Sequence, residues 1–115
     1  MTPRFTAEQR QRLEALHRAY LRDLPGKLRA IERAAASLSP LDPEGLRALL
    51  HLVHRLTGSS AIYGFDRLSR ASAALEELLL SAAEGASLAA RGGDPALAER
   101  LAALRAEAAS AGDRG

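Results

Sequence analysis

The chain has 115 residues, of which 47% are hydrophobic, 26% charged and 3% aromatic, and its formal net charge is +2. This length allows one domain with a modest core and is too short for a kinase or another enzyme of several lobes. No long apolar run is present, so we expect no membrane-spanning helix, and residues 1–10 lack the apolar segment of a secretory signal. Cysteine is absent, which excludes disulfides and thiol chemistry and fits a cytoplasmic protein.

The charges are unevenly distributed along the chain. Residues 1–57 carry ten Lys/Arg and six Asp/Glu, whereas residues 58–115 carry six and eight. The basic first half suits an acidic partner. Because the basic residues form no cluster and few aromatic side chains could stack on bases, we do not expect nucleic-acid binding.

Alanine, leucine, arginine and glutamate dominate and β-branched residues are scarce, which favours helices throughout. A capping box of Thr6 and Gln9 predicts where the first helix begins. Pro25-Gly26 is expected to break or kink this helix, so that a second helix follows. The apolar stripes of these two helices are Leu13, Leu16, Tyr20 and Leu24, then Leu28, Ile31, Ala35 and Leu38.

Three further helices are marked by their end signals. Asp42-Pro43 begins a helix over residues 43–63, and Gly64 suits the left-handed position that ends it. Asp66 is expected to cap the next helix and Asp94-Pro95 the last one. Their apolar stripes are Leu46, Leu49, Leu50, Val53, Leu56 and Ser60; Leu68, Ala71, Leu75, Leu78, Leu79 and Ala82; and Leu97, Leu101, Leu104 and Ala108. Gly92-Gly93 is expected to lie in a loop.

The connections are short, so consecutive helices should be antiparallel neighbours. The predicted fold is all-α: an up-down antiparallel four-helix bundle with an additional short N-terminal helix. We expect a single domain over residues 1–115, with the bundle at about 6–109 and a disordered tail over 110–115. We also expect a monomer, because the apolar stripes are used within one bundle.

The segment from His51 to Phe65 carries more than a helical pattern. Gly58 lies inside a predicted helix, where glycine costs about 1 kcal/mol relative to alanine. At 100° per residue, His54 lies outside the core stripe, with Gly58 one turn later and Arg47 and His51 on the same face. An uncovered imidazole suits a nucleophile that must meet another protein's surface, since neutral histidine can attack a phosphoryl group.

The residues His54-Arg-Leu-Thr-Gly58-Ser59-Ser60, followed by Gly64-Phe65, Leu68, Ala71 and Leu75-Glu76, resemble a histidine phosphotransfer (HPt) domain. They are also similar to the N-terminal phosphotransfer domain of the chemotaxis kinase. The resemblance covers about residues 46–80, and the flanking helices match in pattern only.

The resemblance implies a phosphotransfer protein of a two-component phosphorelay. His54 would be phosphorylated on its outer ring nitrogen and would exchange the phosphoryl group with the aspartate of a response-regulator receiver domain. A sensor or hybrid histidine kinase would be the other partner. The receiver would supply Mg²⁺ and most catalytic groups. This chain would bind no cofactor or metal and, lacking a phosphate-binding loop, would be a phosphoryl carrier without its own ATP site.

The resemblance also implies roles for individual residues. Glu76 would orient the imidazole, and Gly58 would leave it accessible. Thr57 occupies the position where the family has a lysine that helps to neutralise the phosphoryl group, which bears on phosphohistidine lifetime and transfer rate. The candidate partner-binding residues are Arg47, Leu50, His51, Arg55, Ala61, Ile62 and Phe65, of which Phe65 equally suits the core.

Three alternatives stay open at this point. The chain could be a non-catalytic helical adaptor that binds a signalling partner, which Thr57 in place of lysine favours. Gly58 could serve close helix packing instead of access. His51 and His54 are spaced as a possible metal pair, but without a convincing carboxylate ligand nearby this is a weak site.

Overall fold

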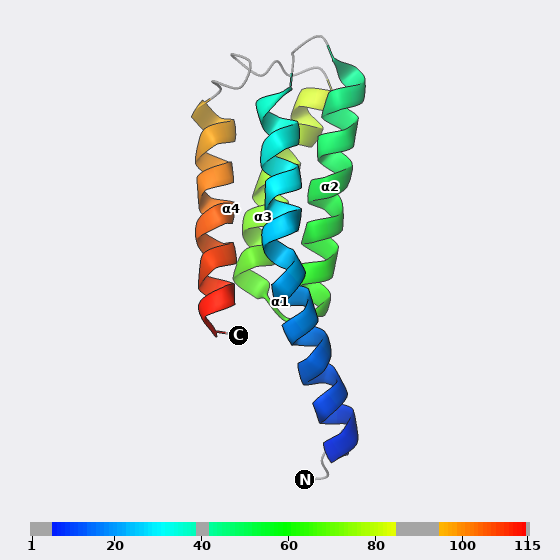
Figure 1. Cartoon of the computed structure of the whole chain (residues 1–115). Coiled ribbons are helices and arrows are strands. Elements are labelled where there is room, and N and C mark those ends of the chain that lie inside the picture. The colour runs from blue at the N-terminus through cyan, green and yellow to red at the C-terminus, as the bar shows by residue number, and fades with distance from the viewer. Residues whose placement is uncertain (1–5, 39–41, 85–94, 115) are drawn as a thin grey trace.

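The computed structural model describes residues 6–38, 42–84 and 95–114, which form four helices. These are α1 (Ala7–Ala36), α2 (Pro43–Ile62), α3 (Asp66–Ala83) and α4 (Pro95–Arg114). Figure 1 shows α1 and α3 running in one direction and α2 and α4 in the other. Each helix packs closely against two others, in the ring α1–α2–α3–α4, and among the described residues the backbones of the diagonal pairs lie farther apart. The chain is therefore an all-helical bundle with its core between the four helices.

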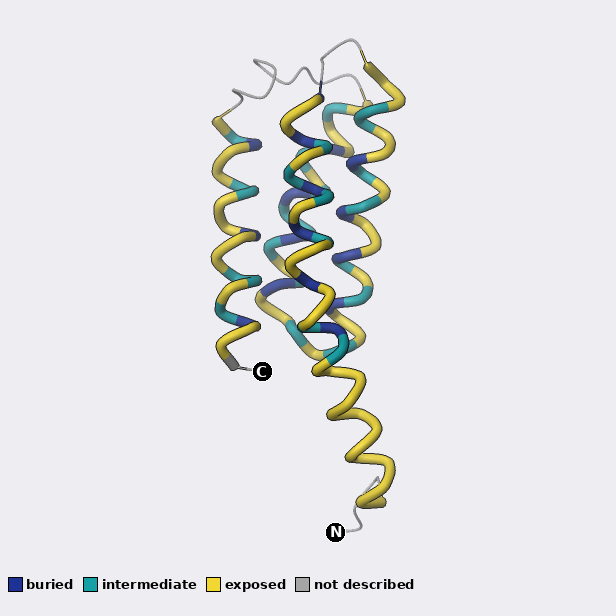
Figure 2. Tube along the Cα trace, in the orientation of Figure 1, coloured by how far each residue is buried: buried dark blue, intermediate teal, exposed yellow. Residues whose placement is uncertain are grey.

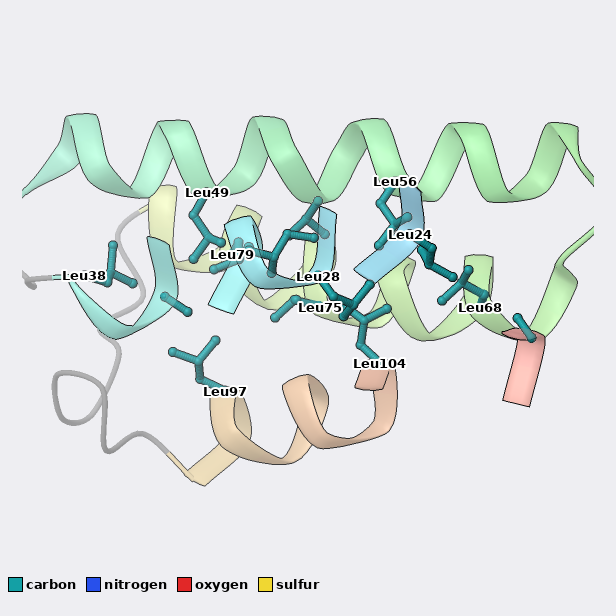
Figure 3. Packing of buried hydrophobic residues seen from close by; sticks show 14 of the residues in the cluster. Leu24, Leu28, Leu38, Leu49, Leu56, Leu68, Leu75, Leu79, Leu97 and Leu104 are labelled. Carbon is teal, nitrogen blue, oxygen red and sulfur yellow. The ribbon is translucent and has the colours of Figure 1, made fainter. Parts of the chain in front are cut away.

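Leucine side chains from all four helices fill the centre of the bundle (Figure 3). Leu49, Leu75, Leu79 and Leu104 are 0% exposed. Each such side chain contributes about 1.5–3 kcal/mol relative to an exposed position, so the stripe residues are the main source of stability. The structure confirms the predicted stripes of the last three helices at their buried positions, which are Leu49, Val53, Leu56, Ser60, Leu68, Leu75, Leu79, Leu97 and Leu104.

The predicted caps of α1 and α2 are both present. The Thr6 hydroxyl accepts a hydrogen bond from the Gln9 backbone N–H at 3.1 Å, and the Gln9 side chain accepts one from the Thr6 N–H at 2.8 Å. The Asp42 carboxylate accepts from the Gly45 N–H at 2.9 Å. These bonds satisfy backbone donors that the first helical turn leaves unpaired.

The turn between α2 and α3 depends on Gly64, which has a φ of +81°. This is the left-handed conformation that glycine adopts without steric cost. The Phe65 N–H donates to the Ser60 carbonyl at 2.8 Å, so the chain reverses within three residues and α3 returns along α2. Phe65 is the N-cap of α3 and makes no side-chain cap bond, so the prediction that Asp66 caps this helix is wrong by one residue.

The prediction of a separate short N-terminal helix is wrong, because α1 is continuous through Pro25. Proline inside a helix removes one backbone hydrogen bond and costs about 3 kcal/mol. The buried stripe continues on both sides of it, through Leu24 and Leu28, and this burial offsets the cost. Pro25 itself is exposed and faces away from the core.

The first three turns of α1 project beyond the end of the bundle. Residues 6–18 are exposed throughout, as Figure 2 shows. Leu13 and Leu16, predicted as part of the core stripe, are 41% and 49% exposed. The apolar pattern correctly predicts a helix over these residues. Leu13 and Leu16 stay exposed because no other helix of the described chain extends far enough to cover them.

The disordered tail predicted over residues 110–115 is wrong for residues 110–114. Helix α4 continues to Arg114, and Ala111 is fully buried. Ala111 lies seven residues after Leu104 and so falls on the same face of the helix, which holds this last part of α4 against the core. The predictions for Gly92-Gly93, Asp94 and Gly115 lie outside the described residues.

Two arginines attach α4 to its neighbours. Arg105 pairs with Glu32 of α1, and the Arg100 Nε donates to the Ala74 carbonyl of α3 at 3.1 Å. Both contacts join residues far apart in the sequence. None of the described helices is long and apolar enough to cross a membrane.

Replacing Pro25 with alanine should stabilise the fold by roughly 2 kcal/mol, because the substitution restores a helix-interior N–H and removes a steric clash. Urea denaturation followed by circular dichroism measures the change. Pro43→Ala is the matched control, since Pro43 occupies the first position of α2, where proline is well tolerated. Equal effects of the two substitutions would contradict this account of α1.

Candidate functional site

His54 and Glu76 meet across the α2–α3 interface. The Nδ1 atom of His54 lies 2.6 Å from Oε2 of Glu76. The histidine side chain is 72% exposed and the glutamate side chain 17% exposed. The antiparallel return of α3 along α2 brings together these two residues, which are 22 positions apart, so the pairing depends on the turn at Gly64.

This contact fixes which ring nitrogen carries the proton. An ionised carboxylate can only accept hydrogen bonds, so Nδ1 must carry hydrogen and donate it to Glu76. In the neutral imidazole the other nitrogen, Nε2, then holds a lone pair. Nε2 has no hydrogen-bond partner among the described residues. In its neutral form the ring therefore presents an oriented Nε2 lone pair on a largely exposed side chain.

Gly58 lies one turn after His54 and is exposed. A Cβ atom built at this position would meet nothing within 4 Å, so the alternative that Gly58 allows close helix packing is wrong. Side chains in a helix lean toward its N-terminus, so a larger residue at position 58 would lie over the turn that carries His54. Glycine leaves that flank of the imidazole uncovered.

Thr57, at the position of the expected lysine, is directed into the α2–α3 interface. Its hydroxyl donates to Ser72 Oγ at 2.8 Å, and the Ser72 hydroxyl donates to the Val53 carbonyl at 3.1 Å. The Ser69 hydroxyl donates to the Thr57 carbonyl at 3.0 Å. These bonds, which we call the hydroxyl ladder, connect α2 to α3 beside the His54–Glu76 pair. Thr57 thus acts as a structural residue and brings no positive charge.

Sequence reasoning did not identify Ser69 and Ser72 as part of the site. Ser72 is fully buried, and it lies four residues before Glu76 on the face of α3 that packs against α2. One signal could have identified Ser72. It is a small polar residue at a position where the helix pattern is otherwise apolar, and it lies one turn from Glu76.

The comparison with protein-family models identifies the chain. Residues 4–107 match the model of the Hpt domain. The chain belongs to the Hpt domain family. Hpt domains act in histidine phosphotransfer within phosphorelays, where they interact with receiver domains and kinases. Comparison with curated proteins and with solved structures gave no match.

Most of the predicted partner-binding residues of this Hpt domain lie on the open surface of α2. Arg47, His51, Arg55 and Ala61 are exposed, and Ile62 is 82% exposed. Arg47 and His51 provide basic groups before His54, Arg55 follows His54 directly, and Ala61 and Ile62 provide an apolar end. One surface thus combines basic and apolar side chains around the imidazole.

The other two predicted partner-binding residues, Leu50 and Phe65, are half-buried against the core. Phe65 stacks on Tyr20 with ring centroids 5.7 Å apart, and Tyr20 lies 4.8 Å from Tyr63. The Tyr20 hydroxyl is 2.8 Å from Ser59 Oγ, and burial raises the pKa of this phenol while the hydrogen bond opposes the shift. This aromatic cluster attaches α1 to the α2–α3 turn, so Phe65 belongs mainly to the core of the Hpt domain.

Gly58→Ala should stabilise the Hpt domain by about 1 kcal/mol, because alanine is the better helix former and its methyl group has open space. Gly64→Ala should destabilise it by about 1–2 kcal/mol, because the left-handed conformation strains an L side chain. Urea denaturation of both variants gives the two values. Destabilisation by Gly58→Ala would show that Gly58 serves packing after all.

Proposed function

We propose that this Hpt domain carries a phosphoryl group on Nε2 of His54 and exchanges it with the aspartate of a response-regulator receiver domain. The observation that carries the proposal is the 2.6 Å contact between His54 Nδ1 and Glu76 on an otherwise exposed ring. A surface histidine without function needs no half-buried carboxylate partner of this kind. Direct partners of the domain would be a receiver and a sensor or hybrid histidine kinase.

The transfer step follows from the arrangement of atoms. The lone pair of Nε2 attacks the phosphorus of the receiver's aspartyl phosphate, the N–P bond forms, and the P–O bond to the aspartate breaks with its electrons remaining on the carboxylate. The ring then carries a positive charge while Nδ1 keeps its proton, and the Glu76 carboxylate stabilises that charge. Transfer to a receiver reverses each change. Mg²⁺ and the remaining catalytic groups come from the receiver.

The charge that the family lysine would provide has to come from elsewhere, because Thr57 is occupied in the hydroxyl ladder. Arg47, His51 and Arg55 are exposed on α2 on the His54 side of the helix and make no ion pair among the described residues. We propose that this basic surface meets the acidic phosphorylation pocket of the receiver. Ala61 and Ile62 then provide apolar contacts at the other end of the interface. We expect the domain to act as a monomer that binds its receiver transiently.

An adaptor without phosphotransfer is the second candidate, and the neutral, structurally engaged Thr57 favours it. The adaptor gives no reason for the His54–Glu76 bond or for an exposed glycine inside α2. The glycine destabilises α2 locally, and a binding surface alone requires neither feature. We therefore favour the phosphoryl carrier.

His54→Gln should abolish phosphorylation of the domain. The measurement is transfer of labelled phosphate, with Mg²⁺ present, from receivers of the same genome phosphorylated on their aspartate. The readout is acid-labile, base-stable label on this chain. His17→Gln is the matched control and should keep the label, since His17 lies on α1 and pairs with no carboxylate among the described residues. Label on the His54 variant, or none on the wild type from any receiver, would favour the adaptor.

Glu76→Gln should lower the phosphorylation rate at least about tenfold, because the amide can donate to Nδ1 as well as accept from it, so it no longer fixes the proton there, and it cannot balance the ring charge. Glu77→Gln is the matched control; Glu77 is the next residue on α3 and is exposed. Rapid-quench kinetics with the same phosphorylated receiver gives both rates. A Glu76 variant as fast as the Glu77 variant would exclude the orienting role of Glu76.

A further inference from the structure

A groove lies between α1 and α2, away from the α3-facing contact of His54 with Glu76. Its volume is about 410 Å³, within the range of clefts that hold small molecules in proteins. The groove is open because some of the residues that line it have small side chains or none, namely Gly26 and Ala30 of α1 and Ser59 of α2. The two helices are adjacent in the ring of the bundle, yet their side chains do not fill this space.

The walls of the groove are apolar and its rim is charged. Ile31 and Leu56 are buried at its base, and Leu52 is half-buried beside them. Three ionisable side chains, Asp23, Lys27 and Arg55, complete the lining. Two cations and one carboxylate give the groove a net positive charge.

The cations of the rim are not paired with the carboxylate. Among the described residues neither Lys27 nor Arg55 forms an ion pair with Asp23, although Asp23 lies four residues before Lys27 on α1. The Lys27 Nζ instead lies 4.2 Å from the centre of the Tyr20 ring. The aromatic face holds the ammonium group at the rim while leaving its hydrogen-bond donors available.

We propose that this groove binds an amphiphilic organic anion, a carboxylate with an aliphatic chain of about the length of decanoate. The aliphatic chain would lie along Ile31, Leu52 and Leu56, and the carboxylate would lie between Lys27 and Arg55. Charge complementarity selects an anion over a cation of the same length, and the apolar base selects an amphiphile over a small hydrophilic acid. The proposal uses neither His54 nor Glu76 and shares only Arg55 with the proposed receiver-binding surface.

Titration of the ¹⁵N-labelled protein with sodium decanoate, below its micelle concentration, tests the proposal by two-dimensional NMR. Backbone amides of the groove residues should shift and saturate. Decyltrimethylammonium, which has the same chain length and the opposite charge, should give at least about tenfold weaker binding. The His54→Gln variant should bind decanoate as the wild type does, which separates this test from that of phosphotransfer.

Two variants and their controls make the test specific. Ala30→Leu, which fills the groove, should weaken decanoate binding at least about tenfold, and Lys27→Gln should weaken it about fivefold. Ala36→Leu and Arg22→Gln are the matched controls on exposed positions of α1 outside the groove, and should bind as the wild type does. Lys27→Gln removes a charge at the rim without adding volume, so it decides the outcome if Ala30→Leu does not fold.

Three results would overturn the proposal. The first is the absence of saturable shifts at groove amides. The second is equal binding of the anion and the cation, or wild-type binding by both groove variants. The third is that the same amides shift with protein concentration alone, which would assign the groove to a second copy of the chain.

Discussion

The antiparallel packing of α2 on α3 is the constraint on which the site depends. His54 and Glu76 lie on different helices, so their 2.6 Å contact exists only in one register of the two. The turn at Gly64 sets that register, and the buried leucines and the hydroxyl ladder hold it. A shift of α3 by one residue would turn Glu76 about 100° away from His54. The orientation of the imidazole is therefore a property of helix packing.

The same packing allows the site to include residues that are unfavourable by themselves. Gly58 lowers the intrinsic stability of α2, and His54 is largely exposed, yet the opposite face of the helix has Leu49, Val53 and Leu56 in the core. Because a helix in a bundle is stabilised mainly by its buried stripe, the exposed face is free to vary. His54, the proposed nucleophile, can then be open to a partner while its backbone stays fixed, as transfer chemistry requires.

The sequence predicts the parts of this structure that follow from local pattern. The caps Thr6 and Asp42 and the apolar stripe of α2 can be recognised from the spacing of residues in the sequence. The place of Glu76 beside His54 was predicted from the family resemblance. The continuity of α1 through Pro25 was missed because the penalty of proline is local, whereas the burial that offsets it comes from other helices. Leu13 was placed in the core for a related reason. An apolar stripe shows which face of a helix is apolar and does not show whether another helix is long enough to cover it.

The two faces of α2 divide the remaining polar chemistry of the bundle. Toward α3, the position of the expected lysine is occupied by Thr57, whose hydroxyl donates a hydrogen bond to Ser72. The positively charged groups of α2 are found instead on its open surface and toward α1. Arg55 is among them: it follows His54 in the sequence and also lines the groove. A cation that is not fixed by a buried partner can turn to either side, at the usual entropic cost of ordering a long side chain. Under the proposed function, these cations of the open surface would supply the charge that the family's lysine brings, while Glu76 holds the imidazole.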